Sequence, residues 1–195
     1  MTSSVVSFVG LAGYAPYAPA KAALRSLADS LRSEMNMYNG YRKANPAKGP
    51  SADVRIHCVF PGTISSPGLE LENTYKHPVT KVLEEGDTVQ TEDEVAAAAI
   101  KGLERGGYLI STQLLGEAMK VGMLGGSPRN NWVVDTLFGW AAYVIWLFVG
   151  MDLEGKVWKY GLRNEIELPG PMTTERTILN GKVAKGKAAN GKANK

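Results

Sequence analysis

The chain has 195 residues, which is enough for one domain with a real core and a further segment. Hydrophobic residues make up 44% of it and charged residues 21%, so most of the chain is expected to fold. The formal charge is +3, but residues 182–195 carry five lysines and no acid, which leaves −2 for the rest. This balance, without a cluster of Lys or Arg interleaved with aromatics, argues against a basic nucleic-acid-binding protein, and we expect no nucleic-acid partner.

The cysteine and histidine content narrows the chemistry further. Cys58 is the only cysteine, so no disulfide can form within the chain, which is typical of a domain that faces the cytosol. Its apolar surroundings favour a small buried hydrophobic residue over a reactive thiol. His57 and His77 have no partner at metal-ligand spacing, so no metal site is assigned. Residues 1–10 lack a basic region and a long apolar core, so a signal peptide is not expected.

The first predicted elements are a strand end and a long helix. Residues 3–16 begin with β-branched residues and run into glycines and a proline, which is typical of a strand that ends in a loop. From Pro19 onward, apolar residues recur every three or four positions with charged residues between them. This pattern predicts an amphipathic helix over 19–38 with proline in its first turn, ended at Asn39-Gly40.

The next stretch predicts a buried strand between two irregular segments. Residues 41–52 read as a polar loop. The apolar residues within 53–62 are too closely spaced for a strand with one solvent-exposed face, so we expect a strand that is buried on both faces and stops at Pro61-Gly62. Residues 63–90 contain Ser-Pro-Gly, His-Pro and Glu-Gly-Asp, which we interpret as breakers, and this segment is predicted to be irregular.

A second helix and a third strand follow. Thr91 and Glu94 have the spacing of a capping box, and glycines follow the last turn, so a helix is predicted within 91–107. Residues 108–112 predict a short strand. Strands that alternate with helices and are themselves buried indicate an α/β fold with a parallel sheet, and we assign this domain to residues 1–112.

Residues 132–151 form an apolar stretch in which only Asp135 is charged. As a helix this stretch is about 30 Å long, enough to cross the core of a bilayer. Trp132 and Trp146 lie near its ends, as interfacial anchors do. We favour a membrane-associated helix, spanning or lying on the surface, with Asp135 at the headgroup level; the alternative is a helix buried in a core or a dimer interface. The flanking Lys and Arg residues leave the orientation undecided.

Two further segments complete the predicted organisation. Residues 113–131 are a Gly-containing connector between the α/β domain and the apolar helix. Residues 152–195 are predicted to be a polar tail that is disordered and Lys-rich from about 182, because Lys, Gly, Ala and Asn cannot bury enough apolar area to fold. A role for this tail at an anionic membrane surface is the less favoured alternative to a solvated tail.

Tyr17 and Lys21, in the stretch YAPAK, are the candidates for proton chemistry. Positions i and i+4 of a helix project from the same face, so the two side chains can meet at one site. An ammonium beside a phenol favours the phenolate, and such a pair can protonate the oxygen of a ketone as hydride reaches its carbon. Taken alone, a Tyr-x-x-x-Lys match is weak, and an ordinary helix start remains the alternative.

The residues around this pair resemble the short-chain dehydrogenase/reductase family. Ser4 lies thirteen residues before Tyr17, and the predicted strand after the helix ends in PGTISSPG. The family has the same order: a serine at the end of its fifth strand, Tyr-x-x-x-Lys at the start of the next helix, then Pro-Gly after the sixth strand. The resemblance covers about residues 1–112 and implies the C-terminal half of a Rossmann-like, doubly wound parallel sheet, here followed by a membrane-associated helix.

The resemblance implies a role for each matched residue. Ser4 would hydrogen-bond the substrate carbonyl, Tyr17 would be the general acid, and Lys21 would bind the ribose next to the nicotinamide. The implied cofactor is NADPH, and Tyr17 would also contact it. Four residues would lie along the nicotinamide: Pro61, Gly62, Thr63 and Ile64. Where the family usually has a threonine three residues after Pro-Gly, this chain has Ser65, which keeps the hydroxyl.

Within the family, the stretches 13–35 and 60–73 resemble members that reduce the ketone of a long-chain sphingoid base at the endoplasmic reticulum membrane, with the catalytic part facing the cytosol. The apolar stretch agrees with a lipid substrate. The alternatives are a reductase of another lipid or hydrophobic ketone, and a non-catalytic membrane-tethered module. Members of the family dimerise through the helix that corresponds to 19–38, so a homodimer through this helix is a further expectation.

The family also has a Gly-rich turn after its first strand, where backbone N–H groups receive the pyrophosphate of the cofactor. GMLGGSPRN is rich in glycine but does not follow a first strand. The sequence therefore has the motif of the reaction site without the family's pyrophosphate site. From this we expect a shortened form of a longer enzyme, and we expect that the chain alone neither binds NADPH nor turns over substrate.

Overall fold

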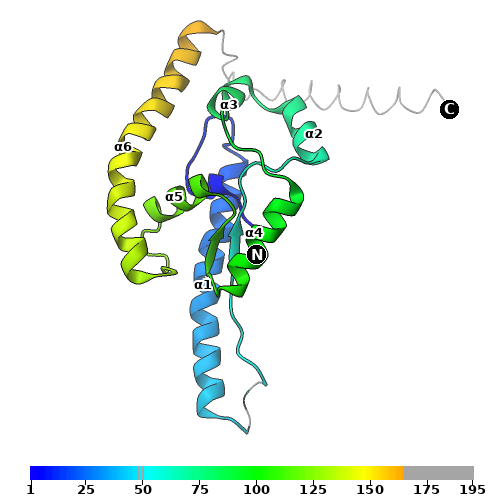
Figure 1. Cartoon of the computed structure of the whole chain (residues 1–195), viewed down its shortest axis with the longest axis vertical. Coiled ribbons are helices and arrows are strands. Elements are labelled where there is room, and N and C mark those ends of the chain that lie inside the picture. The colour runs from blue at the N-terminus through cyan, green and yellow to red at the C-terminus, as the bar shows by residue number, and fades with distance from the viewer. Residues whose placement is uncertain (48, 50, 165–195) are drawn as a thin grey trace, which may run out of the picture. The chain divides into compact units, whose positions relative to one another are not determined.

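The computed structural model describes residues 1–47, 49 and 51–164. The described part is mostly helical with a small parallel sheet (Figure 1). Its elements in chain order are η1 (Val5–Ser7), α1 (Tyr17–Ala44), β1 (Cys58–Phe60), α2 (Pro67–Tyr75), α3 (Pro78–Leu83), α4 (Glu92–Glu104), β2 (Leu109–Ser111), α5 (Leu114–Gly122) and α6 (Trp132–Arg163). Met1–Tyr160 form one compact unit, and the candidate site described below lies within it. The Lys-rich stretch 182–195, expected to be disordered, lies outside the described residues.

Three consecutive segments pair in parallel, as predicted. β1 pairs with β2 in the register Cys58↔Leu109 to Phe60↔Ser111. The N-terminal segment lies along the other edge of β1, where the N–H of Ser3 donates to the carbonyl of Val59 at 2.8 Å. The predicted first strand is represented in the structure by the parallel bridge between Thr2 and Val59. The N–H of Val5 donates to the carbonyl of Pro61 at 3.0 Å, so residues 3 and 4 lie beside the end of β1.

The middle strand is shorter than the predicted 53–62. Residues 53–57 lie outside the ladder: the backbone of Val54 is bound by a side chain of α1, and the carbonyl of His57 accepts from the N-terminal ammonium at 2.8 Å. The Asn39 side-chain amide accepts from the N–H of Val54 at 3.0 Å and donates to its carbonyl at 2.9 Å. Arg42 forms a salt bridge of 2.7 Å with Asp53.

The long helix α1 extends beyond the predicted range of 19–38 at both ends. The Asn39-Gly40 pair does not end it, because the Asn39 side chain binds the 53–57 segment and Gly40 keeps a negative φ. The helix instead ends at Ala44, where the N–H of Asn45 returns to the carbonyl of Tyr41 at 3.0 Å. At the other end Tyr17 is the first helical residue, which places it beside the end of the first strand.

The segment 63–90 contains two helices that sequence analysis did not predict. In both α2 and α3 the proline that we took for a breaker is the first residue of the helix, where its missing N–H is no loss. Ser66 caps α2 by accepting from the N–H of Leu69, and the His77 ring caps α3 by accepting from the N–H of Val79. The Gly-containing connector 113–131 likewise contains a helix, α5.

The elements predicted for 91–112 are confirmed. The Thr91 hydroxyl accepts from the N–H of Glu94 at 3.2 Å, and the Glu94 carboxylate accepts from the N–H of Thr91 at 2.7 Å, which completes the capping box of α4. β2 follows after two glycines. Gly102 of α4 lies directly over Ile110 of β2, where a Cβ would come within 2.3 Å of the Ile110 side chain, so the helix packs closely on the sheet.

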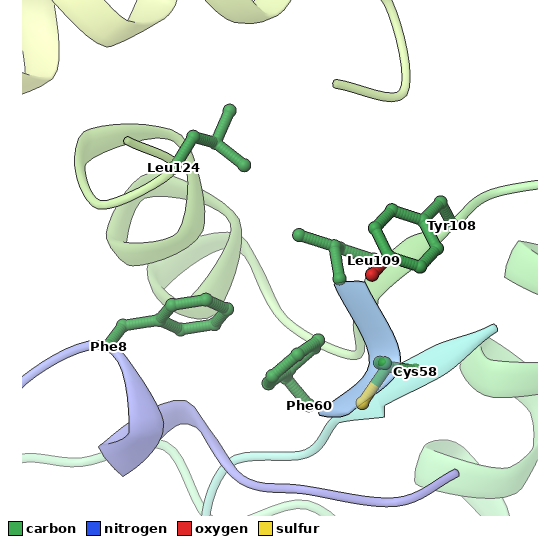
Figure 2. Packing of buried hydrophobic residues seen from close by; sticks show 7 residues of the cluster. Phe8, Cys58, Phe60, Tyr108, Leu109 and Leu124 are labelled. Carbon is green, nitrogen blue, oxygen red and sulfur yellow. The ribbon is translucent and has the colours of Figure 1, made fainter. Parts of the chain in front are cut away.

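The core lies on one face of this small sheet (Figure 2). Cys58 is fully buried in it, as predicted for a small hydrophobic residue. The rings of Phe8 and Phe60 pack against each other with centroids 4.6 Å apart. The cluster consists of Phe8, Ala28, Cys58, Phe60, Tyr108, Leu109 and Leu124. Residues from η1, α1, both strands and the loop after α5 thus meet at one point.

Helix α6 begins where predicted but runs on to Arg163, twelve residues past the predicted end at 151. It is the one helix in the described residues that is long and apolar enough to cross a membrane, and its most apolar 18-residue window has a mean hydropathy of 1.7. Asp135 in its first turn is buried, and its carboxylate accepts from the N–H groups of Asn130 and Asn131 at 2.8 and 3.1 Å. The helix can therefore anchor the chain in a membrane, with its first turn fixed to the preceding loop.

Candidate active site

Tyr17 and Lys21 lie on one face of the first turns of α1, as their spacing predicts. The Lys21 ammonium is 5.4 Å from the centroid of the Tyr17 ring. Tyr17 is 41% exposed, so its hydroxyl is open to a ligand rather than used in packing. The turn is held by Ser3, whose buried hydroxyl donates to the Lys21 carbonyl at 2.7 Å. Sequence analysis gave Ser3 no role, and this contact ties the strand end to the helix that carries the pair.

The residues singled out from the sequence line a single cavity of about 600 Å³. They come from three places in the chain: the end of the first strand, the start of α1, and the stretch after β1. These residues are Ser4, Tyr17, Lys21, Pro61, Gly62, Thr63 and Ile64. Ser3 and Ser4 both line the cavity, and the Ser3 hydroxyl also binds the backbone of α1. Ser66 lines the cavity as well and caps α2, whereas Ser65 is exposed.

The stretch Pro61–Ile64 leaves no room for a side chain at Gly62. A Cβ at Gly62 would lie 2.1 Å from the side-chain nitrogen of Gln113. The Oε1 atom of this same Gln113 is buried and has no hydrogen-bond partner in the part of the chain that the structure describes. The Gln113 side chain therefore occupies the space on the Cβ side of Gly62, so a larger residue there would have to displace it. An ammonium at Lys21 and hydroxyls at Tyr17 and Ser4 complete a set that fits the nicotinamide and ribose end of a nicotinamide cofactor.

A polar cluster that sequence analysis missed borders the same cavity. The Tyr14 hydroxyl lies 2.9 Å from a carboxylate oxygen of Glu72 and 2.5 Å from one of Glu84, and its single proton is shared between these two acceptors. Lys76 binds the same two carboxylates, at 3.0 Å for Glu72 and 2.7 Å for Glu84. The Tyr14 and Tyr17 rings are 5.4 Å apart, so this cluster is in direct contact with the candidate acid. The i, i+4 spacing of Glu72 and Lys76 was the one signal in the sequence that could have indicated part of it.

The cluster shifts the pKa values of its members. Burial raises the pKa of the Tyr14 phenol well above its ordinary 10.0, and the hydrogen bonds to Glu84 and Glu72 raise it further. Burial works against the charge of Lys76, but hydrogen bonds to Glu84 and Glu72 outweigh it, so its pKa is raised. In the core, burial and a hydrogen bond to Asp29 raise the pKa of Tyr108 in the same way.

These two tyrosines predict loss of stability in alkali. Above pH 10.0 the unfolded chain loses its tyrosine protons while folded Tyr14 and Tyr108 keep theirs, so the free energy of unfolding falls as pH rises. Each such tyrosine contributes a slope of about 1.4 kcal/mol per pH unit. Urea denaturation at about pH 9 and about pH 11 measures this slope. Tyr14→Phe and Tyr108→Phe should each reduce it, and the exposed Tyr41→Phe should leave it unchanged; equal slopes in all variants would contradict the assignment.

The far side of the cavity is apolar and comes from other elements. Helix α5 contributes Leu115, Ala118 and Met119, and α6 contributes residues from Ala142 to Leu153. The cavity thus has a polar side with the Tyr-Lys pair and an apolar side with the membrane-type helix. Among the described residues, no group of three or more His, Cys, Asp or Glu side chains could hold a metal ion.

Comparisons with known proteins agree on one group of relatives. No family model matches the chain, and no solved structure matches it. A 3-ketodihydrosphingosine reductase of Aspergillus fumigatus is 49% identical over 166 residues, which cover 85% of this chain and 45% of that protein. One of Neurospora crassa is 43% identical over 159 residues, 82% of this chain and 41% of that protein. A fusion protein of PIGF and 3-ketodihydrosphingosine reductase from Schizosaccharomyces pombe is 34% identical over 87% of this chain and 31% of its own length.

These matches fix the part of the relatives to which the chain corresponds. It spans less than half of the length of the curated relatives that it matches. The matched part is their C-terminal portion, and identity extends over most of this chain. The chain is therefore homologous, over most of its length, to the C-terminal portion of proteins named 3-ketodihydrosphingosine reductase.

Proposed function

We propose that this chain is the catalytic C-terminal portion of an enzyme that reduces 3-ketodihydrosphingosine to dihydrosphingosine with NADPH, in sphingolipid biosynthesis. The observation that carries the proposal is the convergence of Ser4, Tyr17, Lys21 and the stretch 61–64 on one cavity. The names of the homologues support the reaction and the sphingoid-base ketone substrate. The three parallel segments support the C-terminal half of a Rossmann-like sheet, which remains part of the proposal.

The roles of the residues follow from their chemistry. The Ser4 and Tyr17 hydroxyls hold the ketone oxygen of the substrate at the polar side of the cavity. NADPH, when bound, supplies the hydride that adds to the carbonyl carbon. The C=O double bond becomes a C–O single bond, and Tyr17 gives its phenolic proton to that oxygen, so the product is the secondary alcohol. Lys21, 5.4 Å from the Tyr17 ring centroid, stabilises the phenolate that remains and faces the ribose hydroxyls.

The cofactor residues of the proposal are those that the cavity brings together. Pro61, Gly62, Thr63 and Ile64 lie along the nicotinamide, and their place in the wall of the cavity supports this part of the proposal. The proposal names NADPH because the residues resemble those of the short-chain dehydrogenase/reductase family.

The remaining parts of the proposal concern location and assembly. Helix α6 supports an anchor at the endoplasmic reticulum membrane, with the cavity on the cytosolic side. A homodimer through residues 19–38 is supported by the exposure of Leu27 and Met37 on α1. Reduction of another lipid ketone is the second candidate function, and the apolar side of the cavity supports it equally.

The test is a chimera in which this chain replaces the matched C-terminal portion of the Aspergillus fumigatus relative. Purified in detergent, the chimera should oxidise NADPH when 3-ketodihydrosphingosine is added. The 195-residue chain alone should show neither turnover nor micromolar binding of NADPH in equilibrium dialysis. A folded chimera that binds NADPH but leaves the ketone intact would refute the proposed reaction. Micromolar binding by the chain alone would refute the need for the additional N-terminal portion.

A further inference from the structure

The apolar side of the cavity belongs to a contact between α5 and α6 that small residues make possible. Figure 1 shows one end of α5 lying next to α6. A Cβ at Gly122 would lie 2.4 Å from the Trp146 ring nitrogen and 3.3 Å from the Ala142 Cβ. A Cβ at Gly139 would lie 3.4 Å from the carbonyl of Val121. Residues 139, 142 and 146 are spaced by three and four, so one stripe of α6 faces α5 and brings the two helices together.

The cavity opens on the C-terminal side of this contact. Its wall on α6 consists of Ala142, Ile145, Trp146, Val149 and Leu153, and its wall on α5 includes Ala118 and Met119. None of these side chains is charged, and no charged residue occurs between 136 and 151. The other end of the same cavity is the polar side with Tyr17 and Lys21. A ligand that fills the whole cavity therefore needs a polar end and a long apolar end.

We propose that the wall between α5 and α6 is a binding site for a linear alkyl chain, whose polar end reaches Tyr17. The inference rests on the proposed function only for the chemistry at that polar end. A cavity of about 600 Å³ is within the usual range of about 300–1,000 Å³ for ligand sites. The apolar outer face of α6, with Phe138 and Leu147 exposed, makes a lipid layer the source of such a ligand. One helix then serves both as the anchor and as the wall along which the chain lies.

The affinity of such a site depends on chain length in a known way. Each methylene that moves from water into an apolar site gains enough free energy to tighten binding about fourfold. The gain should continue only until the cavity is filled. A ligand that merely dissolves in the detergent around α6 shows no such limit and no dependence on the residues of the wall.

The experiment uses the whole 195-residue chain in nonionic detergent, without NADPH. The probe is a linear methyl ketone with a photoreactive diazirine at the far end of its chain, and labelled residues are identified by mass spectrometry. Labelling should be saturable and should fall on Met119, Ile145 or Val149. Unlabelled methyl ketones of increasing chain length should compete about fourfold better per methylene until a plateau. Non-saturable labelling, or labelling of Phe138 and Leu147 instead, would overturn the proposal.

A matched pair of variants tests the wall directly. Ala118→Phe places a ring in the cavity from α5, and it should weaken competition by the longest ketones by about tenfold or more, since several methylenes lose their place. Ala141→Phe makes the same change on the exposed face of α6, outside the cavity wall, and should have no effect. Circular dichroism checks that both variants keep their helices. Equal affinities for the two variants would also overturn the proposal.

The labelling and competition experiments are independent of the test of the proposed function, because neither of them measures turnover. A chimera that fails to reduce the ketone refutes the reaction while saturable labelling of the wall still establishes the alkyl site. A chimera that reduces the ketone, together with labelling outside the wall, upholds the reaction and refutes only the site.

Discussion

On the proposed function, we expect Tyr17→Phe to lower kcat for reduction of 3-ketodihydrosphingosine by about 10²- to 10⁴-fold in the chimera, which is the range for loss of a general acid. The substitution removes one oxygen. It leaves the ring, and with it the packing against Tyr14 and the contact with the Lys21 ammonium. Because Tyr17 is 41% exposed and makes no core contact, the fold should be unaffected. Steady-state kinetics with NADPH in excess measures the effect.

The split between kcat and KM separates the proton donor from a mere binding contact. If Tyr17 gives the proton, kcat falls while the KM for the ketone changes by less than about tenfold. Tyr41→Phe is the matched control, because Tyr41 is an exposed tyrosine on the same helix, far along α1 from the cavity. A Tyr17→Phe chimera with the full kcat would refute the role of Tyr17 as the acid, whatever its KM.

Phe60→Ala destabilises the chain by about 3–5 kcal/mol, the cost of deleting a buried aromatic ring. Phe60 is fully buried at the centre of the core, and its ring packs on Phe8 with centroids 4.6 Å apart. The residue directly after it, Pro61, lines the cavity, so the loss should also loosen the site. Chemical denaturation of the chain in mild detergent measures the free energy of unfolding.

Two further variants serve as controls for the destabilisation expected of Phe60→Ala. Phe60→Leu keeps most of the volume, and its cost should be well below that of Phe60→Ala. Phe148→Ala removes the same ring from the exposed face of α6, so the free energy of unfolding should change by less than about 0.5 kcal/mol. A Phe60→Ala variant as stable as Phe148→Ala would mean that β1 is not the centre of the core.

Sequence analysis succeeded where the information is local. The capping box of Thr91 and Glu94 needs residues three apart, and the Tyr17-Lys21 pair needs residues four apart on one helix. The parallel pairing of the three strand segments followed from their alternation with helices and from buried apolar runs. The capping box and the Tyr17-Lys21 pair each act within one turn of helix, whereas the parallel pairing joins distant segments and was predictable because the order of the elements along the chain indicates it.

The sequence was misleading where one residue type can serve two structural roles, and it was uninformative where the contacting residues lie far apart in the chain. Proline ends some helices and begins others. The prolines at 67 and 78 begin α2 and α3, and the residues before them, Ser66 and His77, cap the N-termini of these helices. Asn39 looked like a helix stop, but its amide is used by Val54. The contacts of Tyr14 with Glu72 and Glu84 join residues 58 and 70 positions apart, which no local pattern contains.

The contact of Trp146 with Gly122 gives the chain an optical property. The other three tryptophans, Trp132, Trp140 and Trp158, are 69%, 68% and 71% exposed, whereas Trp146 is partly buried against α5. Indole emission shifts to shorter wavelength in an apolar setting, so Trp146 should emit apart from the other three in water. Its ring also lines the cavity, within reach of any bound chain. The fluorescence of Trp146 should therefore report on a chain that binds in the cavity beside α6.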